Sequence, residues 1–340
     1  MSSDTHTLAP ASAGQSAEAT PTRALGAGAY LNCFLGIVWR EVLRFLHQRE
    51  RFLSALVRPL IWLFIFAAGF RQVLGVSIIP PYTTYVLYET FVTPGLVGMI
   101  LLFNAMQSSL SMVYDRETGA MRTLLVSPFP RSFLLASKLI GGVFVAVLQA
   151  YVFLFVARLW EAWSWDTPVM DAFGTGGVGG MAGALYENIG GTITQLGNVD
   201  PTPLGYLTLL PALILSGLML GSIALFMSSV IKQLENFAGV MNFVIFPMFF
   251  MSSALYPIWR LRESSPLLAT LAELNPFTHA VELIRFALYG QIGPTLDNGS
   301  LDLTHLYVVV GCTLLFLGAA VFAYNPSKGL IARRGGPGGG

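Results

Sequence analysis

Residues Tyr114–Lys138 read YDRETGAMRTLLVSPFPRSFLLASK and form a polar island in an otherwise apolar chain. Nearly uncharged apolar runs flank this island, Phe91–Val113 before it and Phe133–Leu159 after it. Each run is long enough to cross a membrane, so the pattern predicts a loop that joins two spans. The charges of the island then lie together at one membrane face.

The first half of the island has the pattern of a short amphipathic helix. The run 117–126 favours a helix, and Ser127-Pro128 ends it because a residue before proline disfavours the α region. A rigid helix on the membrane surface, acidic at its start and basic at its end, would fit a groove in a partner domain. The alternative is an ordinary charged loop between spans.

The order of residues in the island resembles the coupling-helix region of type-2 ABC exporter permeases, whose relatives export drugs, lipid-linked sugars and polysaccharides. The residues that carry the resemblance are Asp115, Arg116, Glu117, Gly119, Arg122, Leu124, Leu125, Ser127, Pro128, Arg131, Leu135 and Lys138. The resemblance covers about residues 31–330 and implies that Asp115 to Pro128 couple the chain to an ATPase. Arg122 stands where the family usually has an acid, so one contact to the partner is expected to differ.

Composition restricts the class of protein independently of any motif. Hydrophobic residues make up 54% of the chain and charged residues only 11%, which predicts an integral membrane protein rather than a water-soluble globule. The long apolar runs predict that this membrane protein is all-α. The net charge of +1 gives no reason to expect nucleic acid as a partner. Cys33 and Cys312 imply no disulfide framework.

Hydropathy predicts six spans. They are expected at residues 53–74, 91–113, 133–159, 207–230, 237–255 and 306–324. In the fourth, Gly217 and Gly221 have the spacing that lets helix backbones approach closely. Residues 1–30 are predicted to be a disordered cytoplasmic tail, and residues 331–340 a second flexible cytoplasmic tail. Residues 31–52 are predicted to be an amphipathic helix on the inner leaflet, or alternatively a soluble helix packed on a partner.

Two outer regions complete the organisation. Residues 160–205 form an insert, read either as a gate or partner contact or as a tolerated surface insertion. Residues 257–303 contain two helical patterns too short to cross, Ser265–Leu274 and Pro276–Tyr289. The arrangement resembles the outer re-entrant helices of the same family, which implies an outer gate. Its residues are Pro257, Asn275, Pro276, Thr278 and Arg285.

The distribution of lysine and arginine predicts the orientation. Six spans place both termini on one side, and fourteen of the nineteen basic residues fall on that side, against five on the other. The fourteen are Arg23, Arg40, Arg44, Arg49, Arg51, Arg58, Arg116, Arg122, Arg131, Lys138, Lys232, Lys328, Arg333 and Arg334. By the positive-inside rule, the termini and the loop 114–132 are expected in the cytoplasm.

Other chemistries lack the patterns they need. Gly174–Gly179 matches GxGxxG, but no strand–helix–strand unit surrounds it, which favours a flexible loop over a dinucleotide site. The sequence has no GxxxxGK[ST], so ATP and magnesium are expected in a separate subunit, with no cofactor in this chain. Its four histidines are scattered in sequence and show no metal-ligand spacing.

The competing function is an ion-coupled secondary transporter or a channel subunit. Such proteins keep an ionisable residue inside a span, and none of the eighteen acids lies in the middle of a predicted span. Together with the coupling-type loop, this favours the permease subunit of an ATP-binding-cassette exporter, and the family resemblance implies a location in a bacterial inner membrane. Its expected partners are ATPase subunits, a second permease copy and membrane lipid, while the substrate stays open.

Overall fold

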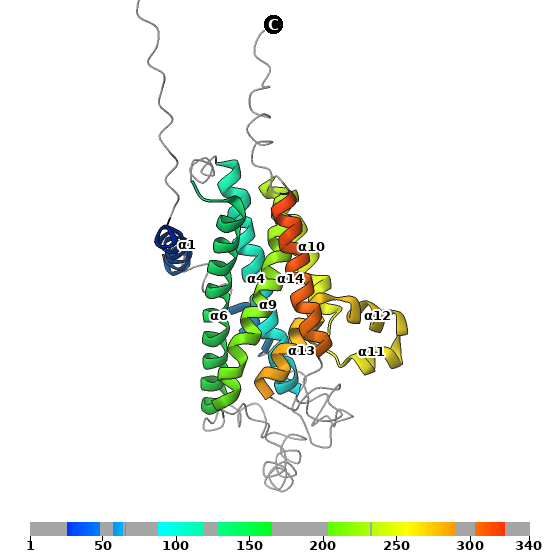
Figure 1. Ribbon diagram of the computed structural model, residues 1–340. Helices are drawn as coiled ribbons and strands as arrows, with labels where there is room; N and C mark the ends of the chain where they lie inside the picture. The colour runs from blue at the N-terminus through cyan, green and yellow to red at the C-terminus, as the bar shows by residue number, and fades with distance from the viewer. Residues whose placement is uncertain are drawn as a thin grey trace, which may run out of the picture.

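The computed structural model describes residues 26–47, 57–63, 65, 88–118, 128–164, 203–231, 233–289 and 303–323, and all regular structure within them is helical. The helices are α1 (Ala27–His47), α4 (Tyr88–Glu117), α6 (Arg131–Ser164), α9 (Pro203–Val230), α10 (Leu234–Phe250), α11 (Ile258–Ser264), α12 (Pro266–Leu274), α13 (Pro276–Tyr289) and α14 (Leu303–Ala323). Figure 1 shows α4, α6, α9 and α14 running along a common bundle axis, with α1 seen end-on against α6. The all-α prediction is confirmed for the described part of the chain.

Four helices are long and apolar enough to cross a membrane. Their apolar segments are Thr90–Asp115, Ser132–Leu159, Gly205–Val230 and Leu303–Ala323, and the shortest has 21 residues. At about 1.5 Å per residue, even that helix reaches about 30 Å, the thickness of the hydrocarbon core. These helices match four of the six predicted spans.

The other two predicted spans are not established. Helix α10 is apolar but has only 17 residues, at the lower limit of what a span requires. The predicted span 53–74 falls mostly outside the described residues, of which 57–63 and 65 are helical. The count of six spans therefore stays a prediction.

The two ends of the bundle differ in what they carry. Helix α4 ends and α6 begins at the end that lies at the top of Figure 1, which we call the loop end; Glu117, Arg131 and Leu234 lie there. Helices α11–α13 gather toward the opposite end, which we call the re-entrant end (Figure 1). The two predicted functional regions thus lie at opposite ends of the same helices.

Glycines let the central helices pack closely. A Cβ atom added to Gly221 of α9 would lie 2.4 Å from Leu139 Cδ1 of α6, and one added to Gly217 would lie 3.0 Å from Val143 Cγ1. On the other side of α6, a Cβ at Gly142 would lie 2.8 Å from Ser108 Oγ of α4. The predicted close approach at Gly217 and Gly221 is confirmed, and it makes α4, α6 and α9 one closely packed unit.

Several predicted boundaries are wrong by a few residues. Helix α1 begins at Ala27 rather than Leu31, because Tyr30 is held edge-on against Phe129 and Phe133 with ring centroids 5.1 Å apart in both pairs. Residues 27–30 are therefore helical, whereas a disordered tail was predicted. Residues 1–25, 48–52 and 331–340 lie outside the described residues.

The other boundary errors come from longer or shorter helices. Helix α6 continues to Ser164, five residues into the predicted insert, and the rest of the insert up to residue 202 lies outside the described residues. Helix α10 ends at Phe250 rather than Leu255, and turns occupy residues 251–256. The short helix α11 was not predicted.

Candidate functional site

At the loop end, a buried ion pair joins α4 to α6. Lys138 Nζ lies 3.3 Å from Asp115 Oδ2, and the two side chains are only 8% and 15% exposed. Asp115 was predicted to lie in the loop ahead of a short helix, but it lies in the last turn of α4. The pair therefore links the last turn of α4 to the N-terminal part of α6.

A second contact joins α4 to α10. The exposed carboxylate of Glu117, the last residue of α4, accepts a hydrogen bond from the backbone N–H of Leu234 at 2.8 Å. This N–H belongs to the first turn of α10, where helical donors have no partner within the helix. Glu117 thus closes α4 and caps α10, instead of beginning the predicted amphipathic helix.

The remaining predicted coupling residues are only partly described. Arg116 lies in α4, and Pro128 is exposed just before α6. Outside the described residues lie Gly119, Arg122, Leu124, Leu125 and Ser127. Their arrangement as a coupling helix stays a prediction.

Sequence reasoning missed Glu41, which is buried on α1. Its side chain is 7% exposed and lies 3.4 Å from Arg40 Nη2 and 3.5 Å from Arg44 Nη1. The pattern of α1 gave no signal, because an acid between two arginines is typical of a solvated helix face. The packing of α1 on α6, which brings Glu41 against Gly141, buries this side chain.

At the re-entrant end, Arg285 of α13 is the largest fully buried side chain among the described residues. It is 1% exposed and pairs with Glu282, one turn earlier on the same helix. Its Nη2 also donates to the backbone oxygens of Ser253 at 2.9 Å and Phe91 at 3.3 Å. The guanidinium lies 4.2 Å from the centre of the Phe91 ring, in cation–π geometry. Arg285 therefore ties α13 to the start of α4 and to the turns after α10.

Asn275 joins α10, α12 and α13. Its Nδ2 donates to the backbone oxygens of Met248 and Met251, both at 2.7 Å, and so satisfies carbonyls at the end of α10. Its Oδ1 accepts the N–H of Phe277 at 3.0 Å, which caps α13 as predicted. Because Asn275 caps both helices, it explains why α10 ends where it does.

The other predicted re-entrant residues have local roles. Pro276 is the first residue of α13, the position where a missing N–H costs nothing. Thr278 Oγ1 donates to the backbone oxygen of Ala272 at 2.6 Å, and Pro257 precedes the first residue of α11. The structure brings Asn275, Pro276, Thr278 and Arg285 together on α13 or its cap, and places Pro257 at the start of α11.

Two histidines that are scattered in sequence lie together in space. His279 Nδ1 of α13 is 2.8 Å from His305 Nδ1 of α14, and His279 Nε2 is 2.9 Å from the backbone oxygen of Glu273. No group of three His, Cys, Asp or Glu that could hold a metal ion occurs among the described residues. The pair fastens α14 to the re-entrant end.

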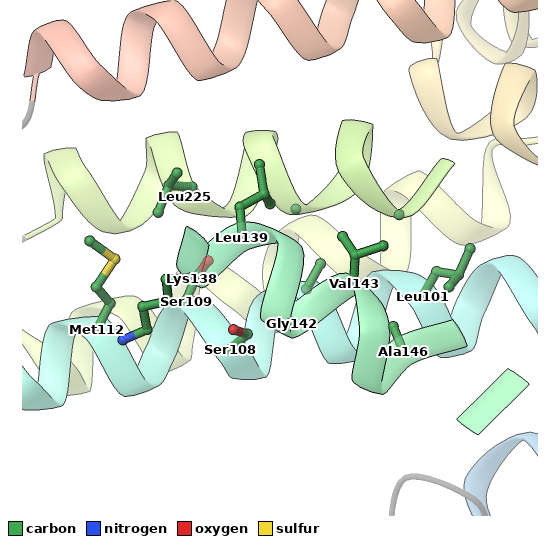
Figure 2. A pocket seen from close by; sticks show the side chains of 13 residues that line it. Leu101, Ser108, Ser109, Met112, Lys138, Leu139, Gly142, Val143, Ala146 and Leu225 are labelled. Carbon is green, nitrogen blue, oxygen red and sulfur yellow. The ribbon is translucent and has the colours of Figure 1, made fainter. Parts of the chain in front are cut away.

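A hydrogen bond between two polar side chains joins α4 and α6 in the interior of the bundle. Asn104 Nδ2 of α4 donates to Gln149 Oε1 of α6 at 2.5 Å, and Gln149 is fully buried. Nearer the loop end, a cavity of about 20 Å³ lies between α4, α6 and α9, room for one or two water molecules. Figure 2 shows Lys138 reaching from α6 toward α4 beside Ser109 and Met112, with Ser108 next to Gly142.

The long apolar helices, with charged groups gathered at the loop end and a buried polar network at the re-entrant end, define a multi-pass α-helical membrane protein. Comparison with known families is more specific. Residues 65–324 match the model of the ABC-2 family transporter proteins, and the chain belongs to this family. The family resemblance of the sequence is confirmed, and the chain is an ABC transporter permease, a membrane subunit that takes part in transmembrane transport.

Three similar proteins accompany the family match, and two of them are named as transport permeases. A protein named as transport permease ycf38 from Pyropia yezoensis is 25% identical over 75% of this chain and 73% of its own length. Nodulation protein J of Neorhizobium galegae is 26% identical over 53% of this chain and 69% of its own length. A protein named as multidrug ABC transporter permease YbhR from Escherichia coli (strain K12) is 27% identical over 58% of this chain and 43% of its own length.

Proposed function

We propose that this permease exports a substrate across a bacterial inner membrane, powered by ATP that a separate ATPase subunit hydrolyses at the loop end. The observation that carries the proposal is the double attachment of the predicted coupling loop. Asp115 is paired with Lys138 of α6 at 3.3 Å, and Glu117 is bonded to the start of α10 at 2.8 Å. A force on the loop therefore reaches three helices of the bundle.

The helices provide a path from the loop end to the re-entrant end. Glycine contacts hold α6 against both α4 and α9, so these helices move together rather than bending past one another. Closure of the ATPase subunits presses on the loop, and the bundle rocks from an inward-facing to an outward-facing pathway. The re-entrant helices α12 and α13 then act as the outer gate.

The membrane arrangement follows from charge. The fourteen-to-five distribution of basic residues favours a cytoplasmic loop end and cytoplasmic termini. Six spans arise when α10 and the predicted span 53–74 cross together with the four long helices. Two copies of the permease with two ATPase subunits complete the complex, and ATP and magnesium bind in the ATPase.

The substrate class is a drug, a lipid-linked molecule or a small organic molecule. The name of the Escherichia coli relative, a multidrug permease, supports this choice. The tryptophan-rich insert 160–205 is the feature in which this chain departs most from a compact permease, and deleting Asp171–Asn198 tests its part in gating. Normal export after the deletion would leave the insert without a role in the transport cycle.

The experiment that tests the proposal replaces loop residues and measures the whole complex. Glu117→Lys and Gly119→Trp are expected to abolish ATPase association, or its coupling to transport, while membrane insertion stays normal. Glu263→Lys, an exposed acid on α11 at the re-entrant end, is the matched control and should change neither. Unchanged ATPase association and transport in both loop variants would contradict the proposal.

A further inference from the structure

The two histidines at the re-entrant end share a contact that depends on how many protons they hold. His279 Nδ1 of α13 is 2.8 Å from His305 Nδ1 of α14, and the ring centroids are 5.0 Å apart. We propose that this pair is a proton-sensitive latch, which holds the start of α14 against α13 at neutral pH and releases it when both rings are protonated. The part of the latch in gating rests on the proposed function of α12 and α13 as the outer gate.

The hydrogen bonds decide which nitrogen carries the proton when both rings are neutral. His279 Nε2 lies 2.9 Å from the backbone oxygen of Glu273, which only accepts, so the proton of His279 is on Nε2. Its Nδ1 then has a lone pair, and the short contact requires His305 to donate from its own Nδ1. His305 Nε2 is left with a lone pair, and this atom is buried without a hydrogen-bond partner among the described residues. The pair therefore joins α12, α13 and α14 in one chain of hydrogen bonds.

The pair keeps its hydrogen bond with one extra proton but not with two. One extra proton on His305 Nε2 leaves the Nδ1–H of His305 donating to the lone pair of His279. A second proton takes that lone pair, so two N–H groups and two positive charges face each other across 2.8 Å. The closed pair therefore binds at most one extra proton, and the open pair binds two.

This difference in bound protons gives the direction of the response to pH. Because the open pair binds one proton more than the closed pair, a fall in pH favours opening. The open-to-closed ratio rises by up to about tenfold per pH unit below the range in which histidine ordinarily titrates, about pH 6.5.

The described carboxylates near the pair are already bound to arginines. Glu273 of α12 pairs with Arg262 of α11, and Glu282 of α13 pairs with Arg285. The other ionisable side chains described on the helices around the pair are Tyr114, Asp115 and Glu117 of α4 and Lys138 of α6, all toward the loop end, and then Tyr151 and Arg158 of α6, Tyr206 of α9, Tyr289 of α13, and Tyr307 and Cys312 of α14. These groups add no carboxylate at the pair, so the described part of the chain does not offset the charge of a second proton.

Acid would release α14 without loosening the other ties of α13. Arg285 bonds to the backbone oxygen of Ser253, and Asn275 bonds to that of Met251, and neither side chain changes its charge near neutral pH. Figure 1 shows α13 beside the first turns of α14, which also packs along α9. Opening of the latch therefore frees the start of α14 from α13. In the proposed arrangement this end faces outward, so external acid loosens the outer gate.

The first measurement reads the protons directly. The full-length permease, labelled with nitrogen-15 histidine, is reconstituted in lipid nanodiscs, and solid-state NMR distinguishes protonated from unprotonated ring nitrogens. At about pH 8, above the ordinary titration range, His305 should carry its proton on Nδ1 and His279 on Nε2. The spectrum of His305→Asn should lack the Nδ1–H signal, which assigns it. At about pH 5 both nitrogens of both rings should be protonated.

The second measurement follows the distance between the helices. Spin labels are attached to Leu274→Cys at the end of α12 and Tyr307→Cys on α14, two positions that are 74% and 68% exposed. The native cysteines are replaced by Cys33→Ser and Cys312→Ala, and dilution with unlabelled chain keeps the measured distances within one molecule. Pulsed electron paramagnetic resonance should show the ratio of the longer to the shorter distance rising about 10- to 30-fold between about pH 8 and about pH 5.

Two variants are the controls for the distance measurement. His305→Asn keeps an N–H group for His279 but cannot gain a proton, so its ratio should change by less than about twofold. His47→Asn removes an exposed histidine of α1 that is not part of the pair, and it should respond to pH as the wild type does.

Several outcomes would overturn the latch. A wild-type His305 that carries its proton on Nε2 at about pH 8 removes the hydrogen bond on which the latch depends. Equal pH responses in the wild type and His305→Asn, or no response in the wild type, show that the pair does not control the distance. The tautomer is read in the wild-type chain, so the test stands even where His305→Asn fails to fold.

A last comparison separates the latch from the proposed function. The spin-labelled permease is assembled with its ATPase at about pH 8 and trapped with ATP, magnesium and vanadate, which should raise the longer-distance fraction as acid does. A complex that traps nucleotide without this change removes the latch from the gate. A permease that binds no ATPase overturns the proposed function and the gating role, and leaves the proton response of the pair in place.

Discussion

The two ends of the bundle both bury charged side chains, but they hold them differently. At the re-entrant end, Arg285 donates to the backbone oxygens of Ser253 and Phe91 in addition to pairing with Glu282. At the loop end, Lys138 and Asp115 contact each other through side chains alone, at 3.3 Å. Backbone partners fix a charge in one geometry, whereas side-chain partners can rearrange. The comparison teaches that α13 is tied firmly to α4 and to the turns after α10, so that the proposed outer gate moves as one rigid unit, whereas the loop end is an adjustable joint.

The largest expected effect of a single substitution lies at the re-entrant end. Arg285→Met leaves the buried carboxylate of Glu282 without its partner and should lower the free energy of unfolding by about 3–5 kcal/mol. Thermal unfolding of the purified protein in detergent measures the loss. The double variant Arg285→Met/Glu282→Leu should recover much of it, because no buried charge is left unpaired.

An exposed ion pair of the same spacing is the control for this prediction. Arg260 and Glu263 of α11 are also three residues apart, but 65% and 62% exposed. Arg260→Met should therefore cost no more than about 1 kcal/mol. If Arg285→Met and Arg260→Met lower the free energy of unfolding equally, the buried ion pair of Arg285 does not anchor the re-entrant end more firmly than an exposed pair does.

A smaller effect is expected from glycines that differ in what they contact. A Cβ at Gly95 of α4 would lie 2.7 Å from the backbone oxygen of Ala254, which cannot move without shifting the turns after α10. A Cβ at Gly221 would clash with the flexible end of Leu139 and otherwise touch Val143 Cγ2 at 4.0 Å, so it would meet side chains and no backbone. Gly95→Ala should therefore destabilise by about 1–3 kcal/mol, and Gly221→Ala by less.

The matched control is Gly239 of α10, where an added Cβ has nothing within 4 Å. Gly239→Ala should be neutral or stabilise the protein by up to about 1 kcal/mol, since alanine favours a helix. Thermal unfolding of the three glycine variants measures the order of their stabilities. If Gly95→Ala proves as stable as Gly239→Ala, the re-entrant end is less rigid than we infer.

The smallest effect on stability is expected from Glu117. Glu117→Gln keeps an acceptor for the Leu234 N–H and lies on the surface, so unfolding should change by less than about 1 kcal/mol. Coupled ATP hydrolysis should nevertheless fall, because the variant changes the charge at the base of the loop. A large loss of stability in Glu117→Gln without any change in ATP hydrolysis would contradict this prediction. The loop end would then be structural rather than functional.

Local signals in the sequence predicted the parts of the fold that depend on neighbouring residues. The bounds of α13 are confirmed as Pro276–Tyr289, because Asn275-Pro276 is a strong helix start. The spacing of Gly217 and Gly221 likewise predicted a close helix contact, which the packing on α6 confirms.

Partners that are distant in sequence could not be predicted. Arg285 contacts Phe91 across 194 residues, and Asn104 contacts Gln149 across 45. Nothing in the local pattern of α1 distinguished Glu41 from a solvated acid, and the two histidines looked scattered because they lie on separate helices. The coupling function of residues 119–127 depends on contacts with another subunit, so it stays a prediction.

The central claim, that the loop end and not the re-entrant end receives the ATPase, is tested most directly by site-specific photo-crosslinking. A benzophenone amino acid replaces Pro128, exposed at the loop end, or Leu274, which is 74% exposed at the re-entrant end. The account predicts an ATPase adduct from position 128, stronger after nucleotide trapping, and none from position 274. An ATPase adduct from position 274, with none from position 128, would contradict it.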